Sequence, residues 1–509
     1  MRVRNWLLER ARLFGSEEAL ESRGGRVSFE TLADLSLRTA GELRRRGVRS
    51  GDLVAALLDN GLEFVELVHA VAMCGARFLP LNTRLTAEEL ALQVRRSGTT
   101  HLIHGGAQLG ERARQLASGL PGLQIAAFEG GQLAGAAQRV HGGELTEHLD
   151  LDAVAAVLFT SGTSGAPKGV CLTYGNLQAS ALGAALHLGL RRDDRWLACL
   201  PLFHIGGLSI LMRNVLLGSP VVIHERFDPE RLSMAIDDGI THVSLVPTML
   251  VRLLDVRGER PAPPSLRGVL LGGAAAPPLV LERARKLRFS VLTSYGLTEA
   301  CSQVATWQPG DLEAPSRESG QVGRALLGTE VRIGDARGRL LPPGREGEIL
   351  VRGPTVMAGY LDDVEETDCA LRDGWLHTGD AGVLDPEGRL RVLDRRADLI
   401  VSGGENVSPA EVEAVLREHP DVAEVGVAGL PDPDLGSRVV AWIVPRSGVR
   451  CRARDLRRFC RQRLAGFKVP KEIRFAAELP RNSSGKLLRR SLPEFGQPDR
   501  DWNSESFSR

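Results

Sequence analysis

Three features are scarce or absent in this 509-residue sequence: an excess of charge of either sign, closely paired cysteines and long apolar runs. The 64 lysine and arginine residues almost cancel the 63 acidic residues, which leaves a formal net charge of +1. With this balance, no overall field attracts nucleic acid or an anionic membrane. We therefore expect neither partner, and any anionic ligand must be held by local groups.

The seven cysteines are odd in number and widely scattered, and none forms a CxxC pair with metal-ligand spacing. They are Cys74, Cys171, Cys199, Cys301, Cys369, Cys451 and Cys460. The pattern predicts reduced thiols in a cytosolic protein.

No segment has the length and apolarity of a membrane span. The most apolar stretch, 207–223, is interrupted by Arg213, Asn214 and Pro220, whereas a span needs about 20 apolar residues. Residues 1–14 repeat apolar side chains at helical spacing, without the apolar core of a signal peptide. We expect an ordinary first helix there and a cytoplasmic location.

Strand-like apolar runs alternate with longer helical patterns, which is typical of α/β architecture. Examples are 153–159, 243–246, 269–271 and 290–292. Several runs end in loops rich in glycine, serine and threonine, and open α/β sheets bind ligands outside the carboxyl ends of their strands. One crevice built from several loops is therefore expected.

The pattern changes after about Gly320, where short strands are separated by glycine and proline turns. Beyond Asp394, the sequence predicts helices over 410–418 and 453–464 and strands over 422–427 and 439–444. The prediction is an α/β fold with two domains. Residues 1–394 form a large N-terminal domain with α/β layers and a β-rich subdomain, and 395–509 form a small α+β domain.

The strongest local signal is a loop in which an apolar strand runs into hydroxyls, glycines and a lysine. Its candidate ligand-binding residues are Thr160, Ser161, Gly162, Thr163, Ser164, Gly165 and Lys168. Small residues let backbone amides and hydroxyls close around phosphate oxygens, and Lys168 adds a positive charge. The loop is not a Walker motif, because Pro167 and Gly169 flank the lysine. In isolation it could also be a solvated turn.

This loop resembles the signature loop of the adenylate-forming superfamily, which includes acyl-CoA synthetases, firefly luciferase and peptide-synthetase adenylation domains. The resemblance implies ATP and Mg²⁺ as cofactors. A second segment resembles the superfamily's adenine and phosphate segment, and it comprises Ser294, Tyr295, Gly296, Leu297, Thr298 and Glu299. There Tyr295 would lie against adenine, Thr298 would contact phosphate and Glu299 would hold Mg²⁺. These residue types suit a purine and a hard cation, although a tyrosine-containing turn remains the alternative.

Two shorter segments match the same nucleotide site. Gly272, Gly273 and Ala274 follow a strand and resemble the adenine-facing wall, where a flat base needs close backbone approach. Asp380 matches the ribose-binding aspartate, which accepts hydrogen bonds from both sugar hydroxyls. A lone aspartate in a loop is otherwise a common turn residue.

The carboxy-terminal third supplies the remaining matches. The segment containing Asp394, Arg395, Arg396 and Ala397 resembles the interdomain hinge, with Arg395 matching the arginine that reaches the nucleotide. Ala397 stands where the superfamily often has aspartate or lysine. Gly403 and Gly404 would line the coenzyme A path once the mobile small domain rotates, and Lys486 matches the lysine that enters the active site for adenylation.

Segment 199–218 is similar to the o-succinylbenzoate:CoA ligases of menaquinone biosynthesis, as are 81–85, 298–304 and 392–400. The resemblance implies an acid:CoA ligase that forms an acyl-adenylate and then passes the acyl group to coenzyme A. His204 would sit beside the adenylate as a catalytic and substrate residue, and Arg84 and Ser302 are candidates for a second substrate carboxylate. Gly206 departs from close relatives, which often carry serine there.

Two other readings stay open. A ligase for a medium-chain fatty acid or an aryl acid would share the nucleotide site and differ in the acid pocket. A non-catalytic nucleotide-binding homologue would keep the fold, although Lys168, Glu299, Asp380, Arg395 and Lys486 together argue against it. The expected partners are small molecules, namely a carboxylic acid, ATP and coenzyme A, and a homo-oligomer is left open.

Overall fold

The computed structural model describes residues 1–129, 132–133, 145–160, 167–309, 320–335, 337–394, 399–446, 449, 451–480, 487, 489–495 and 497–498. The chain separates into two compact units. The first unit comprises 1–83, 93–159 and 169–394, and the second comprises 84–92, 160–168 and 395–509. The second unit is therefore assembled from three separate stretches of chain.

One sheet has parallel central strands. Its order is β21 (Gly359–Tyr360), β11 (Lys168–Thr173), β10 (Val154–Thr160), β5 (Arg77–Pro80), β4 (Leu53–Leu57), β6 (His101–His104), β7 (Gln124–Glu129) and β8 (Gln132–Leu133). Every residue of β4 is buried, as expected for a parallel strand covered on both faces. A separate antiparallel pair joins β1 (Arg2–Arg4) to β9 (His148–Asp150).

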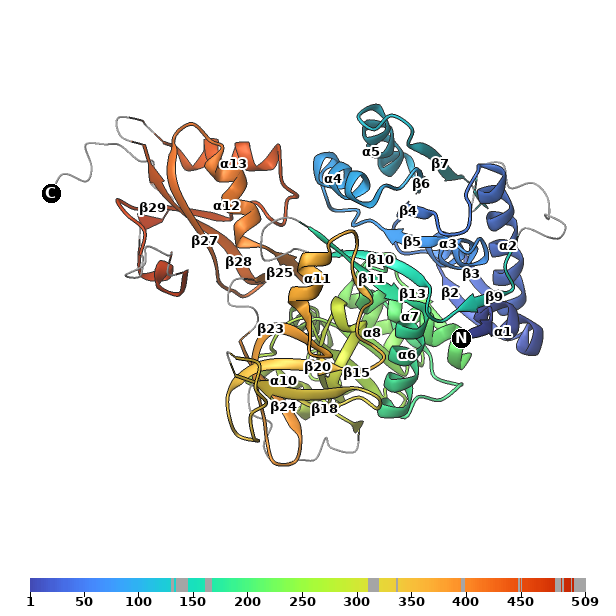
Figure 1. Cartoon of the computed structure of the whole chain (residues 1–509). Coiled ribbons are helices and arrows are strands. Elements are labelled where there is room, and N and C mark those ends of the chain that lie inside the picture. Colours follow the sequence, from blue (N-terminus) through green and yellow to red (C-terminus); the bar gives the residue numbers. More distant parts are fainter. Residues whose placement is uncertain are drawn as a thin grey trace. The chain divides into compact units, whose positions relative to one another are not determined.

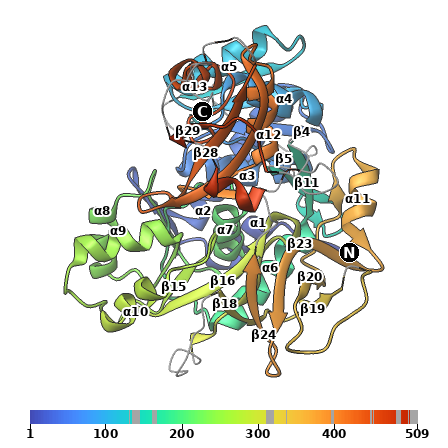
Figure 2. The same cartoon turned by 90° about the vertical axis from the view of Figure 1, so that its left-hand side faces the viewer.

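A second, larger sheet changes character along its length. One half is mainly parallel, and contains β16 (Val291–Leu297), β15 (Gly268–Leu271), β14 (His242–Leu245), β12 (Trp196–Ala198), β13 (Val221–Ile223), β2 (Glu18–Ser22) and the antiparallel edge strand β3 (Gly25–Ser28). The other half is antiparallel, and contains β17 (Ser302–Thr306), β18 (Gln321–Ala325), β24 (Arg389–Asp394), β23 (Trp375–Leu384), β22 (Leu371–Arg372), β20 (Gly347–Arg352) and β19 (Glu330–Gly334). Figure 2 labels β15, β16 and β18 of this sheet, and β17 pairs between β16 and β18. The α/β fold with a β-rich region after Gly320 is confirmed.

Several helices of this part of the chain begin after a residue whose side chain caps them. Through residue 370 the helices are α1 (Trp6–Phe14), α2 (Phe29–Arg45), α3 (Leu62–Met73), α4 (Ala87–Ser97), α5 (Ala107–Ser118), α6 (Tyr174–Leu188), α7 (Ile205–Leu217), α8 (Pro229–Asp237), α9 (Pro247–Arg257), α10 (Pro278–Lys286) and α11 (Val364–Ala370). At the start of α6, Thr173 and Asn176 form a reciprocal capping box. The first helix expected within residues 1–14 is confirmed as α1. The Asn5 side chain accepts the amides of Leu7 and Leu8, so α1 begins at Trp6.

The second unit has its own sheet and core. The sheet comprises β25 (Ile400–Ser402), β26 (Glu405–Val407), β27 (Val422–Asp432), β28 (Gly436–Pro445), β29 (Glu472–Phe475) and β30 (Gln497–Pro498). Helices α12 (Pro409–Arg417) and α13 (Ala453–Arg461) accompany it, in orange and red in Figure 1. Val427, Ile443 and Leu456 are fully buried in a core formed within this unit.

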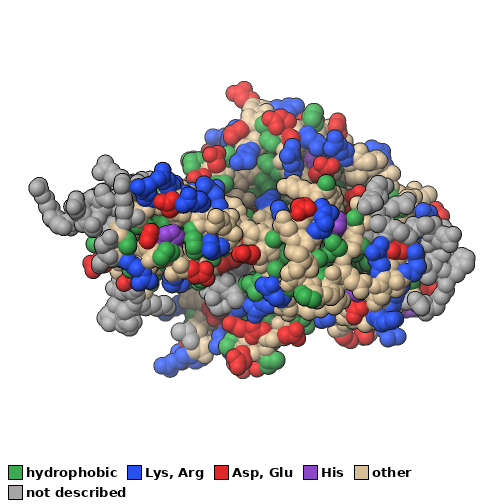
Figure 3. Space-filling view, turned by 90° about the horizontal axis from the view of Figure 1, so that it is seen from above, with side chains coloured by type: hydrophobic (Ala, Val, Ile, Leu, Met, Phe, Trp, Pro, Cys, Tyr) green, Lys and Arg blue, Asp and Glu red, His purple; other side chains and the backbone are tan. Residues whose placement is uncertain are grey.

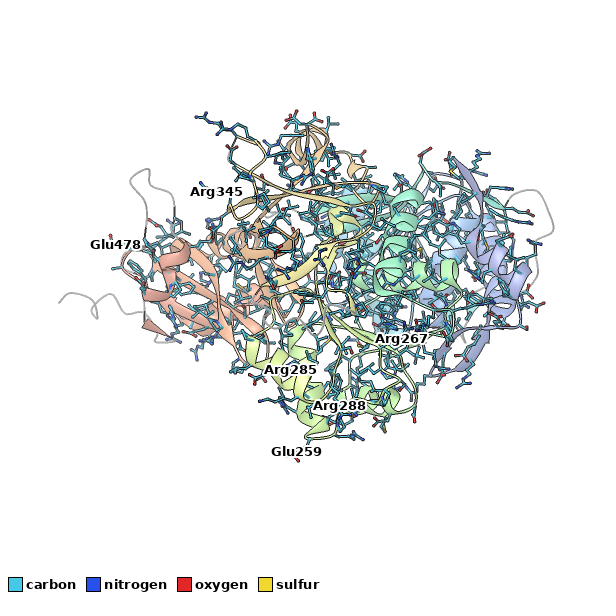
Figure 4. The ribbon with its side chains drawn as sticks, turned by 90° about the horizontal axis from the view of Figure 1, so that it is seen from below. Glu259, Arg267, Arg285, Arg288, Arg345 and Glu478 are labelled. Carbon is cyan, nitrogen blue, oxygen red and sulfur yellow. The ribbon has the colours of Figure 1, made fainter. Side chains whose placement is uncertain are left out.

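The surface carries charges of both signs. Figure 3 shows basic and acidic side chains interspersed over much of the visible face. In the α8–α10 region, Glu259, Arg285 and Arg288 are exposed, and Figure 4 places them at the outer edge of these helices. Arg267, also labelled there, donates to both carboxylate oxygens of Asp194, at 2.5 and 2.7 Å. Among the described residues, no helix has the length and apolarity needed to cross a membrane.

Candidate functional site

Strand β15 of the first unit is followed by residues with little or no side chain, Gly272, Gly273 and Ala274. β15 ends at Leu271, and the amide of Gly272 continues the pairing by donating to the carbonyl of Leu245 at 3.1 Å. Gly273 has φ +85°, a conformation that favours glycine. A Cβ on Gly272 would lie 3.7 Å from the carbonyl oxygen of Ser294, so the structure brings these two predicted segments together.

Strand β16 is longer than the sequence predicted. The predicted run ended at residue 292, but the strand continues to Leu297 because it pairs with β17 in an antiparallel ladder. The register shifts between Tyr295 and Gly296, and a Cβ on Gly296 would overlap the carbonyl oxygen of Ser302. Residues 294–297 are therefore strand residues, and glycine is required at 296 for steric reasons.

Tyr295 and Asp380 form a buried pair. The Tyr295 hydroxyl donates to Oδ2 of Asp380 at 2.7 Å, and Tyr295 is only 1% exposed. Strand β23 holds the aspartate, because its amide donates to Oγ1 of Thr378 and the neighbouring amide, of Gly379, donates to the Glu348 carboxylate. The tyrosine thus orients the predicted ribose-binding carboxylate, while little of its own ring is open to a base.

Glu299 lies in a tight turn between β16 and β17. The turn continues through Cys301 and Ser302, which have φ of +53° and +92° although neither is glycine. Such strained backbone often occurs at functional sites. Glu299 is 6% exposed, and its carboxylate accepts a 3.1 Å hydrogen bond from the Tyr360 hydroxyl. It forms no ion pair within the described part of the chain.

This carboxylate fits Mg²⁺. The described residues contain no cluster of three or more histidine, cysteine, aspartate or glutamate side chains suited to a metal ion. Mg²⁺ does not require such a cluster, because it commonly binds through one or two carboxylates together with substrate phosphates and water. A buried carboxylate without a described cationic partner is a suitable ligand of this kind.

Helix α7 contributes the next group of predicted residues. His204 is the residue before its first turn, and its ring packs against Phe203 with centroids 4.6 Å apart. Ser209, on the same helix, lies with its Oγ 3.5 Å from Oγ of Ser302 at the start of β17. Among the described residues, a Cβ on Gly206 would meet only Leu200, at 3.7 Å, so a serine side chain would have room beside them.

The sequence interpretation missed Arg213. This residue lies on α7, is 2% exposed, and stacks over the Trp196 ring at 4.4 Å. None of its guanidinium nitrogens has a hydrogen-bond partner in the described residues, and burial lowers the pKa of Arg213 to about 9 while the nearby Cys301 opposes that shift. The available signal was a single cation inside the apolar run 210–217; it argues against a membrane span and belongs to segment 199–218, but its position alone does not predict a role for the side chain.

Other predicted residues belong to the second unit. Arg84 donates to Oε1 of Glu405 at 2.7 Å, and that carboxylate is buried. Gly403 and Gly404 have φ of +60° and +85°, as a tight turn between β25 and β26 requires. Thr160 ends β10 and the buried Lys168 begins β11.

The remaining predicted residues lie outside the described residues. They are Ser161, Gly162, Thr163, Ser164 and Gly165 of the phosphate loop, Arg395, Arg396 and Ala397 of the hinge, and Lys486.

Two further predicted residues, Thr298 and Ala274, are described by the structure. Thr298 is half-buried, and its carbonyl accepts a hydrogen bond from the amide of Cys301. Ala274 is half-buried beyond Gly273.

Comparison with protein families identifies the chain. The model for the AMP-binding enzyme family matches residues 7–361, and the model for its C-terminal domain matches 411–486. The chain belongs to the AMP-binding enzyme family. A 2-succinylbenzoate–CoA ligase from Bacillus mycoides is 41% identical to this AMP-binding enzyme over 491 residues, which are 96% of this chain and 98% of the relative.

Solved structures of o-succinylbenzoate CoA synthetase from Bacillus subtilis are also similar. A double mutant bound with its product analogue has a TM-score of 0.90 at 39% identity, covering 98% of this chain and all of the other. The same synthetase with its acyl-adenylate intermediate has a TM-score of 0.74 at 39% identity, with the same coverage. With ATP and magnesium ion, its TM-score is 0.73 at 39% identity, covering 97% of this chain and all of the other.

Proposed function

We propose that this AMP-binding enzyme converts 2-succinylbenzoate to 2-succinylbenzoyl-CoA in menaquinone biosynthesis, consuming ATP and coenzyme A. Relatives that cover almost all of the chain carry this activity in their names. The structural observation that best supports the acid assignment is Arg213, a buried cation for which the described residues provide no hydrogen-bond partner. A second carboxylate on the substrate would supply that partner.

Two balanced half-reactions follow from the chemistry of a carboxylic acid. A carboxylate is a poor electrophile, because its charge repels nucleophiles and its leaving group would be oxide. In the first step, a substrate carboxylate oxygen attacks the α-phosphorus of ATP, and pyrophosphate leaves. In the second step, the thiol of coenzyme A attacks the acyl carbonyl, loses its proton, and releases AMP.

The roles of the individual residues form part of this proposal. Glu299 would hold Mg²⁺, and Lys168 and Lys486 would oppose the charge that spreads over the phosphates. When bound, the divalent cation supplies charge neutralisation at the phosphate oxygens. Asp380, oriented by Tyr295, would accept hydrogen bonds from the ribose hydroxyls. Gly272 and Gly273 would face the adenine base.

Arg213 is a better candidate for the second carboxylate than Arg84. The Arg84 guanidinium is already paired with Glu405, whereas Arg213 has no described hydrogen-bond partner and lies near the Cys301–Ser302 turn. The hydroxyls of Ser302 and Ser209, 3.5 Å apart, are further donors on the same side of α7. His204 would stand at the start of this helix, beside the adenylate.

A monocarboxylic acid is the alternative substrate. A ligase for a medium-chain fatty acid or an aryl acid would use the same nucleotide residues but would leave the Arg213 charge unmatched. We further propose that the enzyme acts in the cytoplasm. The sequence leaves a homo-oligomer open.

The first experiment is ATP/pyrophosphate exchange with 2-succinylbenzoate, benzoate, 4-hydroxybenzoate, cinnamate, octanoate and acetate, followed by addition of coenzyme A. We expect exchange and thioester formation with 2-succinylbenzoate well above every monocarboxylate. Stronger exchange with octanoate or an aryl acid would reject the substrate and keep the ligase chemistry. Nucleotide binding without exchange for any of these acids would favour the non-catalytic alternative.

A further inference from the structure

A short segment of the first unit connects two parts of the nucleotide site. Residues 357–361 run beside β11, the strand that begins at Lys168, and pair with it in an antiparallel register. The amide of Ala358 donates to the carbonyl of Cys171 at 3.0 Å, and the amide of Leu361 donates to the carbonyl of Gly169 at 2.7 Å. The segment is therefore fixed to the strand that leaves the predicted phosphate loop.

The same segment holds Glu299 at two points. The amide of Met357 donates to the backbone carbonyl of Glu299 at 2.9 Å, and the Tyr360 hydroxyl donates to Oε1 of its carboxylate at 3.1 Å. Tyr360 itself is 7% exposed, and its backbone amide is bound to Oγ1 of Thr367 at 2.9 Å. The backbone and the side chain of Glu299 are therefore both held by one segment, which is paired with β11 through residues 358–361.

We propose that Tyr360 is a positioning residue for the Glu299 carboxylate and that it sets the affinity of the enzyme for its metal–nucleotide complex. The inference rests on the proposed function, in which Glu299 binds Mg²⁺. By occupying Oε1, the tyrosine hydroxyl restricts rotation of the carboxylate and aims the other oxygen. Tyr360 would not contact the nucleotide or the metal.

The coordination chemistry of magnesium makes the orientation of the Glu299 carboxylate matter for affinity. Mg²⁺ requires near-ideal octahedral geometry, so a carboxylate that rotates freely is a poorer ligand than one already aimed. Outer partners that orient a metal ligand typically contribute about 10- to 100-fold in metal affinity or activity. We therefore expect Tyr360→Phe, which removes only the hydroxyl, to weaken metal binding by about 10-fold.

The test compares Tyr360→Phe with Tyr174→Phe. Tyr174 is another buried tyrosine of the first unit, and its ring packs on Trp6. Tyr174 and Trp6 do not belong to the proposed site. Binding of Mn²⁺ is measured by electron paramagnetic resonance in the presence of α,β-methylene ATP, which needs no acid substrate and no turnover. Thermal unfolding of the unsubstituted enzyme and of both variants establishes that each protein is folded at the measuring temperature.

The expected result is about 10-fold weaker Mn²⁺ binding in Tyr360→Phe and unchanged binding in Tyr174→Phe. In pyrophosphate exchange, the half-saturating Mg²⁺ concentration should rise by a similar factor, and the rate should recover toward that of the unsubstituted enzyme at high Mg²⁺. Unchanged Mn²⁺ affinity in folded Tyr360→Phe, or a lower exchange rate that high Mg²⁺ does not restore, would overturn the inference.

Failure of the proposed function gives a different result. If the unsubstituted enzyme binds Mn²⁺ and nucleotide but does not activate 2-succinylbenzoate, the acid assignment is wrong and the comparison between the two tyrosine variants still decides the role of Tyr360. If the unsubstituted enzyme binds no Mn²⁺ with the nucleotide, the ATP-dependent function and the inference about Tyr360 are both rejected.

Discussion

Arg213 is the most unusual single residue of the candidate site. A buried guanidinium loses its hydration, and the Trp196 ring offers only partial compensation through its face. Proteins seldom bury an arginine without hydrogen-bond partners, and the described residues provide none here. An anion-binding role explains this arrangement, because a bound anion would accept hydrogen bonds from the Arg213 guanidinium.

We predict that Arg213→Gln raises the half-saturating concentration of 2-succinylbenzoate about 10- to 100-fold, which corresponds to the loss of hydrogen bonds to a charged group worth about 1.5–3 kcal/mol. The half-saturating concentration of ATP should stay the same. Initial-rate pyrophosphate exchange, with each substrate varied in turn, measures both values.

Arg84→Gln is the matched control for this prediction. Because Arg84 is paired with Glu405, its substitution should leave the half-saturating concentration of the acid nearly unchanged in pyrophosphate exchange. If Arg84→Gln raises the half-saturating concentration of the acid and Arg213→Gln does not, Arg84 rather than Arg213 binds the second carboxylate.

The sequence predicts a nucleotide-binding role for the glycines after β15, the Tyr295 segment and Asp380 because each occupies a short motif. It could not identify the hydroxyl contact between Tyr360 and Glu299, since the two residues are 61 positions apart and neither motif predicts the other. Arg213 was missed for a related reason. A lone arginine in an apolar helix is informative only once its surroundings are known to lack an acceptor.

At the scale of elements, the pairing of α2 and α3 buries an acidic group. The hydroxyl of Thr39 on α2 donates to Oε1 of Glu66 on α3, while Oε2 has no hydrogen-bond partner among the described residues. Burial raises the pKa of Glu66 to about 7, although the Thr39 hydrogen bond opposes the shift, Glu63 adds to it and Arg38 opposes it. Helix packing therefore favours the protonated carboxyl.

The sign of the resulting pH dependence follows directly. Near pH 4 and below, Glu66 is largely protonated in both the folded and the unfolded chain, so it contributes little to the change of stability with pH. Between about pH 4.5 and pH 7, the unfolded chain ionises first, so the folded state holds more protons and its stability falls as pH rises. Above pH 7 this decrease in the free energy of unfolding is nearly complete, and it amounts to roughly 3 kcal/mol at most.

We predict that Glu66→Gln removes this loss. Urea unfolding at pH 5 and pH 8 should show a smaller decrease in the free energy of unfolding for Glu66→Gln than for the unsubstituted protein. Glu63→Gln, on the same helix at a half-buried position, is the control and should retain most of the decrease, because burial is the main cause of the raised Glu66 pKa and Glu63 adds only part of it. Parallel pH profiles for Glu66→Gln and the unsubstituted protein would contradict the prediction.

Element boundaries departed from expectation where distant pairing or capping determines them. The apolar run at 290–292 predicts a short strand, but pairing with β17 extends it to Leu297. Similarly, helical periodicity over residues 1–14 does not reveal that residues 2–4 pair with β9, which lies at 148–150. Local patterns predict element type better than element ends, because partners far along the chain also influence the ends.

At the scale of the whole molecule, the two units have separate apolar cores. Ile349 is fully buried in the core of the first unit, and Ile443 is fully buried in that of the second. Cores that share no residues can unfold in separate cooperative steps. The amino-acid composition and strand pattern predicted the fold class, whereas the inclusion of 84–92 and 160–168 in the second unit depends on tertiary contacts that no local pattern encodes.

We predict two calorimetric unfolding transitions. Ile443→Ala should lower the temperature of one transition and Ile349→Ala that of the other, because each creates a cavity in a different core and costs about 2–5 kcal/mol. Differential scanning calorimetry of the two variants checks this assignment. If both variants shift one shared transition equally, the two units unfold as a single cooperative system.

The close approach of β16 and β17 at Gly296 also has a genetic consequence. Every other amino acid that one base change can introduce at a glycine codon carries a Cβ, and a Cβ at this position would overlap the Ser302 carbonyl. No stepwise path of tolerated alleles therefore leads away from glycine at 296 unless β17 shifts first. In a library that samples all single-codon changes, this position should be recovered as glycine alone, whether selection acts on adenylation or on thioester formation.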